Sequence, residues 1–274
     1  MSDESPRGTP TAAPLGSAGA SHAGRQPRDA LGWRCKFGVM APSTNTIVQP
    51  DFDDMRPVGV TNHFSRIFTP NTNALSNETF RAGIDTIGAN VLDAVRSVKT
   101  CEPDYLVMGI SALSFFGGVQ GADAFARQIT EETGLGVTIG SHATAAALQT
   151  LGGIERIAVL TPYWPVMNAE VARYFGDAGL TVVRDLALQC SSWTGIAAVT
   201  SAQCRDAIRQ LDGDDIDAIV QVGTNLSMVR LAAAAELWLG KPVLAINTAT
   251  YWHALRANGI REPVAGFGRL LEQH

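Results

Sequence analysis

The chain of 274 residues lacks several features that define whole classes of protein. It has no run of about 18 or more apolar residues, the length that a transmembrane helix needs, and its amino end has no apolar core of the secretory kind. Lys and Arg do not outnumber Asp and Glu, so the net charge of −5 leaves no basic stripe for a phosphate backbone. We therefore expect a cytoplasmic protein that binds neither membranes nor nucleic acid.

Cysteine is also scarce, and its four residues are scattered over Cys35, Cys101, Cys190 and Cys204. They show none of the short paired spacings of a zinc site or a redox motif. No histidine and carboxylate pair has ligand spacing at an expected strand end, and no glycine-rich phosphate loop follows the first expected strand. We therefore expect no metal and no cofactor, and we expect the thiols to be packing residues in a reducing compartment.

From Cys35 onward, short β-branched runs alternate with longer runs of helical spacing. Strands are expected at residues 35–41, 58–68, 105–109, 137–139, 156–160, 181–186, 218–222 and 243–246. Helices are expected at residues 76–98, 122–133, 143–151, 165–178, 201–211, 228–239 and 248–257. This alternation predicts an α/β fold with helices on the faces of parallel sheets. Residues 1–33, rich in Ser, Gly, Ala, Pro and Thr, are predicted to be a disordered tail.

Several strand-to-helix corners occur twice in the chain. Phe37–Pro42 corresponds to Ile157–Pro162, and Leu106–Ser111 corresponds to Val220–Asn225. The repetition predicts two similar doubly wound parallel-sheet halves related by a pseudo-twofold axis, with a two-sided site between them. The alternative is that βα units resemble one another because the same physics repeats. We expect one half to hold residues 34–141 and 248–274, and the other to hold residues 142–247.

Five segments carry a family resemblance, and they run from about Lys36 to the end of the chain. They are Ala41-Pro42-Ser43-Thr44-Asn45-Thr46, Met108-Gly109-Ile110-Ser111-Ala112-Leu113-Ser114-Phe115, Thr161-Pro162-Tyr163, Gly223-Thr224-Asn225-Leu226 and Gly266-Phe267-Gly268-Arg269-Leu270. In this order they resemble the aspartate/glutamate racemase superfamily, in its maleate isomerase and arylmalonate decarboxylase branch. The resemblance implies a cofactor-independent lyase or isomerase that acts on a small carboxylic acid, in a small homo-oligomer.

The resemblance fails at its reactive groups. Racemases and maleate isomerases of this superfamily use two cysteines, one from each half, and the decarboxylase keeps the second one. The matching positions here are Gly109 and Gly223. Since glycine can neither take nor give a proton, the two-thiol mechanism is excluded. We expect the missing thiols to leave space for an ordered water, and Cys190 is the one thiol expected at the correct edge of a sheet.

The remaining candidates are neutral hydrogen-bonding groups at the strand ends. Such groups can hold an anion and stabilise an oxyanion as charge develops. We expect Asn45, Tyr163 and Asn225 to bind a carboxylate, and Ser111 and Thr224 to donate to an oxyanion. The predicted substrate-binding residues are Pro42, Ser43, Asn45, Gly109, Ile110, Gly223, Thr224 and Asn225. Helix capping is the alternative role for Ser43 and Thr224.

The predicted catalytic residues are Tyr163, His142 and Ser111, and proton transfer is assigned to His142, Tyr163 or a water molecule. His142 follows the strand expected at 137–139, where a side chain could reach a ligand. Tyr163 could donate a proton, but with an ordinary pKa of about 10 it would need a lowered pKa to act as a base. Aromatic residues near the corners would favour a substrate with an apolar or planar part. They are Phe115, Phe116, Trp164, Trp193 and Trp252.

Three functions are compatible with this sequence. The first is a lyase or isomerase that works through an enolate-type intermediate. The second is a hydrolase or hydratase that holds a water beside Gly109 and Gly223. The third is a carboxylate-binding protein without catalysis, because an inactive relative would also have lost both thiols.

Overall fold

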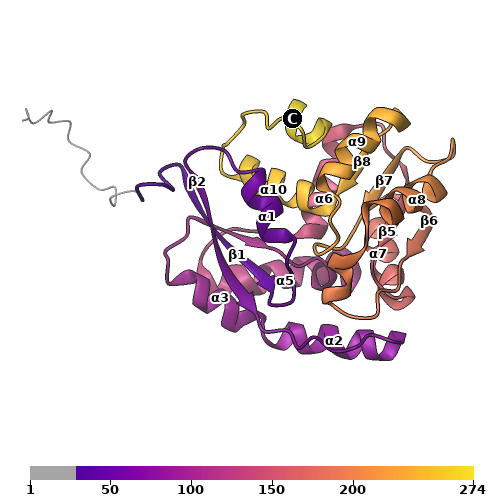
Figure 1. The fold of residues 1–274 in the computed structure, drawn as a ribbon. Helices are drawn as coiled ribbons and strands as arrows, with labels where there is room; N and C mark the ends of the chain where they lie inside the picture. The colour runs from indigo at the N-terminus through magenta and orange to yellow at the C-terminus, as the bar shows by residue number, and fades with distance from the viewer. Residues whose placement is uncertain (1–28) are drawn as a thin grey trace, which may run out of the picture.

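The structure is a computed structural model, in which residues 29–274 are described, and it contains two four-stranded parallel sheets (Figure 1). The first sheet has the order β2-β1-β3-β4, and the second has the order β6-β5-β7-β8. The strands are β1 (Cys35–Pro42), β2 (Val60–Ile67), β3 (Tyr105–Met108), β4 (Val137–Thr138), β5 (Arg156–Thr161), β6 (Thr181–Ala187), β7 (Ala218–Gln221) and β8 (Val243–Ala245). Each strand therefore has a counterpart at the same place in the other sheet, which confirms the predicted α/β fold with two similar parallel-sheet halves.

Helices and loops connect successive strands and cover the sheets (Figure 1). The helices are α1 (Val48–Asp54), α2 (Asn77–Ala89), α3 (Val91–Lys99), α4 (Ala112–Phe115), α5 (Gly118–Thr133), α6 (Gly140–Leu151), α7 (Pro165–Asp177), α8 (Ser201–Leu211), α9 (Val229–Leu239), α10 (Ile246–Ala257) and α11 (Arg269–Gln273), with a 3-10 turn at Thr194–Ala198. The short elements α1, α4 and α11 were not predicted, because a few residues carry too little periodicity.

The helix predicted over residues 76–98 is wrong in one respect, because it is two helices. Asn90 leaves helical geometry between α2 and α3, and its side-chain amide donates to the carbonyl oxygens of Phe68 and Thr86. At the other end of α2, Ser76 and Thr79 form a reciprocal capping box. Because of this break, α2 does not follow the axis of α3, and it extends under the second half (Figure 1).

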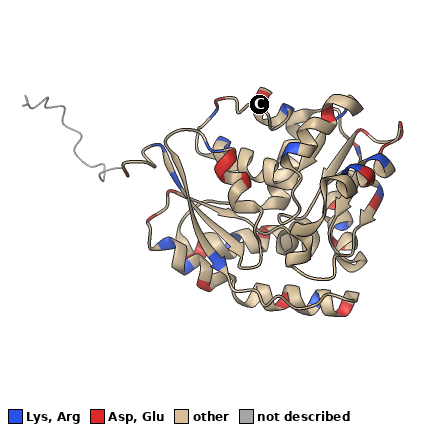
Figure 2. Ribbon diagram, in the orientation of Figure 1, with Lys and Arg blue, Asp and Glu red and all other residues tan. Residues whose placement is uncertain are grey.

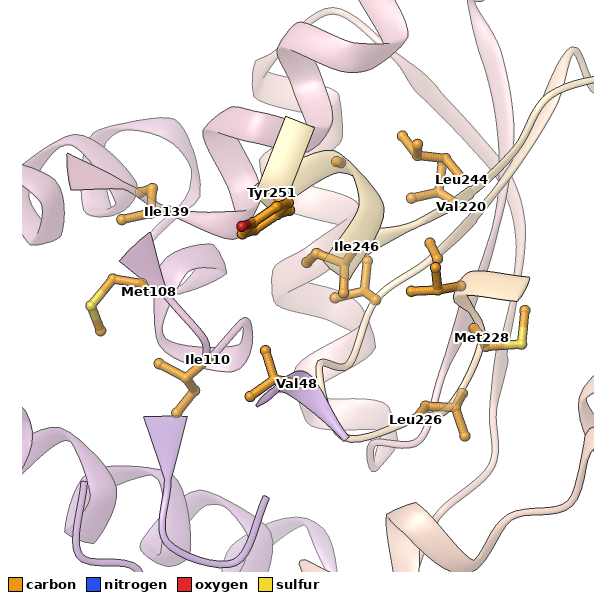
Figure 3. Close-up of a cluster of buried hydrophobic side chains, with 14 of the residues drawn as sticks. Val48, Met108, Ile110, Ile139, Val220, Leu226, Met228, Leu244, Ile246 and Tyr251 are labelled. Atoms are coloured by element: carbon orange, nitrogen blue, oxygen red, sulfur yellow. The ribbon is translucent and has the colours of Figure 1, made fainter. Parts of the chain in front are cut away.

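The hydrophobic core is continuous through both halves. Figure 3 shows side chains of the first sheet, such as Met108, and of the second sheet, such as Val220 and Leu244, with Ile246 of α10 near the centre. These side chains are at most 3% exposed. Helix α10 also contacts β3, β4 and α6, so the end of the chain packs on the first sheet. The domain boundaries at residues 141 and 248 stay a prediction.

Charged residues are found mainly on the outer helices and loops (Figure 2). Among residues 29–274, Glu236 is the only charged residue in the buried class. No helix within that range is both long and apolar enough to cross a membrane. Of the tail predicted over residues 1–33, only residues 29–33 are described, and they form neither helix nor strand; residues 1–28 lie outside the described part of the chain.

Candidate active site between the two sheets

A small cavity lies where the carboxyl ends of β1, β3, β5 and β7 face one another. Its volume is about 40 Å³, and residues from both halves line it. The lining residues are Pro42, Thr44, Asn45, Ile84, Ile87, Ile110, Ser111, Ala112, Tyr163, Trp193, Ile196, Gly223, Thr224 and Asn225. None of them is charged. Any anion in this cavity would therefore be held by neutral hydrogen-bond donors rather than by an ion pair.

Thr224 joins the two halves at the floor of the cavity. Its Oγ1 donates to the carbonyl oxygen of Gly109 at 3.1 Å and accepts a hydrogen bond from Asn45 Nδ2, also at 3.1 Å. Its backbone N–H donates to Ser111 Oγ at 3.3 Å. Thr224 is 5% exposed, so these bonds form away from bulk water. The side chain of Thr224 therefore does not cap a helix. Its hydroxyl bonds instead to Gly109 and Asn45 in the other half.

Asn45 and Asn225 give most of their hydrogen-bonding capacity to the protein itself. Asn45 Oδ1 accepts two backbone N–H groups at the start of α1, at 3.0 and 2.9 Å. Asn225 Oδ1 accepts the N–H of Thr46 at 2.9 Å, and its Nδ2 donates to the carbonyl oxygen of Trp193 at 2.9 Å. Since Asn45 Nδ2 carries two protons and Thr224 takes one, the second proton is the group that Asn45 can offer to a ligand.

Ser111 and Tyr163 form the most polar contact inside the cavity. Their hydroxyl oxygens lie 2.6 Å apart, one from each half. Burial raises the pKa of Tyr163 well above its usual range, and the hydrogen bond to Ser111 offsets only part of that rise. Tyr163 is therefore a protonated donor at every ordinary pH. The structure thus excludes the lowered pKa that Tyr163 would need to act as a base.

At the two glycine corners, neighbouring atoms occupy the positions that Cβ atoms would take, which corrects the expectation of room left by missing thiols. A Cβ atom at Gly223 would lie 2.4 Å from Cδ of Pro162, and the φ of Gly223 is +133°, which side-chain-bearing residues rarely adopt. A Cβ atom at Gly109 would lie 3.1 Å from the carbonyl oxygen of Met40 and 3.2 Å from Cβ of Ala41. A water-based hydratase or hydrolase would therefore have to hold its water in the cavity itself, because no space is left where the thiol-bearing side chains would lie.

Comparison with known proteins identifies the family of this chain. A sequence model of the family described as arylmalonate decarboxylase matches residues 47–271, which is most of the chain. The chain belongs to the arylmalonate decarboxylase family. This confirms the resemblance inferred from the corner segments.

Individual relatives come from both branches named by the resemblance. The maleate isomerase of Nocardia farcinica is 24% identical over 245 residues, which are 87% of this chain and 96% of that protein. The arylmalonate decarboxylase of Bordetella bronchiseptica is 27% identical over 194 residues, 70% of this chain and 80% of that protein. A solved variant of the Nocardia enzyme, with a covalently bound succinylcysteine intermediate, matches the fold with a TM-score of 0.79 at 24% identity, covering 88% of this chain and 99% of that one.

In this member of the arylmalonate decarboxylase family, eight predicted site residues line the cavity. They are Pro42, Asn45, Ile110, Ser111, Tyr163, Gly223, Thr224 and Asn225. Gly109 lies directly behind them and accepts from Thr224. Ser43 is exposed, and its hydroxyl accepts from the backbone N–H of Thr69 at 2.9 Å, so it braces the loop after β2 rather than lining the cavity.

His142 is the clear misplacement among the predicted catalytic residues. It lies in the first turn of α6, after β4, which is the edge strand of its sheet. Its Nε2 lies 3.0 Å from Oδ1 of Asp123, and it lines a separate, larger pocket of about 650 Å³ together with Tyr174. Strand β3 separates β4 from β1, and the side chain of His142 lies beside Asp123 of α5 and Tyr174 of α7. Proton transfer by His142 in the cavity is therefore excluded by its position.

No thiol replaces the family cysteines. None of the four cysteines of the chain lines the cavity. Cys190 is half-buried, and burial raises its pKa to about 11, so it is protonated at neutral pH. Cys204 is fully buried in α8, and Cys35 opens β1 at the opposite end of the sheet. Among residues 29–274, no group of three or more His, Cys, Asp or Glu side chains could hold a metal ion.

The cavity has an apolar wall, of which the sequence predicted only Trp193. Helix α2 supplies Ile84 and Ile87, and the loop after β6 supplies Trp193 and Ile196. Ile84 and Ile87 have the spacing of an ordinary core-facing helix stripe, so the sequence contained no signal for them. Of the five aromatic residues expected near the corners, only Trp193 lines the cavity. The wall makes one side of the site apolar and the opposite side hydrogen-bonding.

Proposed function

We propose that this chain is a cofactor-independent lyase that decarboxylates a small malonate-type acid through an enediolate. The observation that carries the proposal is the chain of neutral donors from Tyr163 O–H through Ser111 Oγ to Thr224 N–H, in a cavity without a thiol or any charged side chain. A thiol-addition isomerase needs a cysteine, and the lining residues contain none. Loss of CO₂ needs neither a nucleophile nor a base.

The chemistry follows from what each group can do. When the bond between the α-carbon and one carboxylate breaks, its electron pair passes to the α-carbon and into the remaining carboxylate, which becomes an enediolate. When Ser111 donates to Tyr163, the Tyr163 O–H and the second amide proton of Asn45 are the free donors placed to stabilise that charge. Tyr163 then gives its proton to the α-carbon and recovers one from solvent. A strongly basic enediolate can take a proton even from a tyrosine whose pKa is raised.

The apolar wall supports the same reaction. A carboxylate placed against Ile84, Ile87 and Trp193 loses hydration that the wall cannot replace, whereas CO₂ is neutral and gains nothing from water. The wall also fits an apolar or planar substituent on the α-carbon, and the cavity volume limits its size. The proposed substrate is therefore a small 2-substituted malonate. The proposal includes a cytoplasmic location and homo-oligomeric assembly.

The test is turnover of phenylmalonate, methylmalonate and maleate in deuterated water, followed by proton NMR and CO₂ release. We expect CO₂ and one deuterium at the α-carbon of the monoacid. Tyr163→Phe should lower kcat/KM roughly 100-fold or more, as loss of an oxyanion donor does. Tyr105→Phe is the matched control, because Tyr105 lies at the amino end of β3, where its hydroxyl accepts from Thr138. Conversion of maleate without CO₂ release would replace the proposal by an isomerase; binding without turnover of any acid would reject catalysis.

A further inference from the structure

Behind the cavity, a buried side-chain amide connects the Gly223–Asn225 turn to a carboxylate. Asn247 is the second residue of α10 and is 2% exposed. Its Nδ2 donates to the carbonyl oxygen of Thr224 at 3.0 Å and to Oδ2 of Asp51 at 2.8 Å. Because a backbone carbonyl can only accept, the orientation of this amide is determined by Thr224. Both protons of Nδ2 are therefore in use, and neither Asp51 nor Asn247 lines the cavity.

Asp51 lies on α1 in a setting that favours its neutral form. Burial raises its pKa from 3.8 to about 6, and the hydrogen bond from Asn247 opposes that rise. Two charged groups act on it: Asp54, on the same helix, raises the pKa further, and Arg230, on α9, lowers it. A carboxyl group with a pKa near 6 changes its charge within the range in which most enzymes work.

The other elements packed against α1 direct their titratable side chains to other partners. On β2, Arg66 donates to the carbonyl oxygen of Asn45 and to Gln49, while the ring of His63 lies 2.9 Å from Thr61 Oγ1. On α10, Asn247 is the side chain that bonds to Asp51. Asn247 is therefore the side chain that links the protonation of Asp51 to the carbonyl oxygen of Thr224.

We propose that Asp51 and Asn247 are positioning residues that hold the Gly223–Asn225 turn in its active geometry, and that they do so only while Asp51 is ionised. As a statement about catalysis, this inference rests on the proposed function. The coupling of Asp51 to the turn does not, because it concerns hydrogen bonds within the free protein.

The second atom of the Asn247 amide explains why the charge of Asp51 matters. Asn247 Oδ1 is buried and has no hydrogen-bond partner among the described residues. A neutral Asp51 is a weaker acceptor for Nδ2 than the carboxylate is, and it gains an O–H that can donate to Oδ1. Pairing both ends of the amide with the carboxyl group draws it toward Asp51 and weakens the bond from Nδ2 to the carbonyl oxygen of Thr224, which is costly in a buried place. The Thr224 N–H that reaches Ser111 belongs to the same turn and shifts with it.

The coupling can be tested without any substrate by NMR of the full-length protein labelled with nitrogen-15. In the wild type, the Thr224 backbone amide and the Asn247 side-chain amide should titrate between pH 4.5 and 8 with a midpoint about pH 6. Asp51→Asn should abolish this titration. Asp53→Asn, the same change two residues away on α1, where the carboxylate accepts from Asn62, should leave it intact. A Thr224 amide that does not titrate, or that titrates unchanged in Asp51→Asn, would overturn the inference.

Kinetics then test whether the coupling positions the catalytic turn. The wild-type kcat on the acid that turns over should fall as the pH drops through about 6. Asp51→Asn should have a kcat several-fold lower at pH 8, with KM changed less, and its kcat should not fall further as the pH drops through 6. Asp51→Glu should restore this fall of kcat at low pH. Asn247→Ala should lower kcat about tenfold or more. A lower melting temperature with unchanged kcat and an unchanged pH profile would show a merely structural role. If no acid turns over, the proposed function fails, and the NMR titration alone decides the coupling.

Discussion

The two glycine corners, Gly109 and Gly223, differ in how firmly the structure requires glycine. At Gly223 the backbone has φ = +133°, and an added Cβ would overlap the ring of Pro162 at 2.4 Å. At Gly109 the backbone is not in the left-handed region, and an added Cβ would press on its neighbours at 3.1 to 3.3 Å. A proline ring cannot rotate away as a flexible side chain can. Gly223 is therefore required by its backbone conformation and by Pro162, whereas Gly109 is favoured only by tight packing.

The corners also differ in how their carbonyl oxygens are held. The carbonyl oxygen of Ser111, in the first half, accepts from the hydroxyl of Ser114 at 2.8 Å. That of Thr224, in the second half, accepts from Asn247, which is backed by Asp51. Two halves with the same strand order thus use a neutral support at one corner and an ionisable one at the other. Corresponding turns of similar folds do not require similar chemistry.

The largest expected effect tests whether Gly223 is required more strictly than Gly109. Gly223→Ala should lower the free energy of unfolding by on the order of 4 kcal/mol, from backbone strain together with overpacking against Pro162. Gly109→Ala, the matched change at the other corner, should cost about 1 kcal/mol, because its neighbours need to move only a few tenths of an ångström. Urea unfolding followed by circular dichroism measures both. Equal losses at the two corners would remove the distinction between them.

The next effect concerns the bonds that join the corners. Thr224→Val keeps the shape of the side chain but leaves the carbonyl oxygen of Gly109 and the amide of Asn45 without a partner. The expected loss is about 2–3 kcal/mol, since each is a buried unsatisfied group. Thr248→Val is the control, because its buried hydroxyl has no partner among the described residues and its replacement should be neutral or stabilising. A Thr224→Val protein as stable as the wild type would show that the corners are held together by packing alone.

A smaller effect concerns Asp51, the ionisable group behind the carbonyl oxygen of Thr224; the carbonyl oxygen of Ser111 is held by the neutral hydroxyl of Ser114. The pKa of Asp51 in the folded protein is about 6, above the unfolded value of 3.8, so the folded state binds the proton more tightly. This contribution to stability is present below about pH 4 and is lost as the pH rises through 6. Asp51→Asn should therefore raise the melting temperature at pH 8 by roughly 2–4 °C, for a gain on the order of 1 kcal/mol, and by little at pH 4.

The control for this measurement is Asp53→Asn, whose carboxylate is exposed and accepts from Asn62. It should not raise the melting temperature at pH 8. A destabilised Asp51→Asn protein at pH 8 would mean that the carboxylate contributes more as a hydrogen-bond acceptor than its burial costs.

The smallest expected effect is at Cys190, the thiol nearest in sequence to the cavity residue Trp193. With a pKa of about 11, fewer than about one Cys190 in a thousand is a thiolate at pH 7.5. Iodoacetamide should therefore leave activity unchanged over a period that alkylates Cys190 fully in urea, as peptide mass spectrometry can show. Loss of activity in step with alkylation of Cys190 in the folded protein would show that a thiol acts here despite the two glycine corners.

Local patterns were sufficient to predict the sheets and the approximate place of the site. The buried runs ending at Pro42 and Pro162, and the small polar turns at Ser111 and Thr224, are short-range signals, and all of them lie where the strand pattern put them. The break at Asn90 could not be predicted, because a single asparagine is tolerated within a helix, and here its amide reaches Phe68 across the fold. The position of His142 was wrong because periodicity does not say which strand lies at the edge of a sheet.

What the sequence determined by itself is the alternation of strands and helices, the repetition of the corners and the absence of both family thiols, since these follow from residue types within a few positions of one another. The tertiary structure alone decided that the glycine corners are filled, that Ile84 and Ile87 form a wall, and that Tyr163 stays protonated. Each of these depends on how closely distant segments pack. Packing sets burial, and burial sets both the space available and the pKa of a buried group.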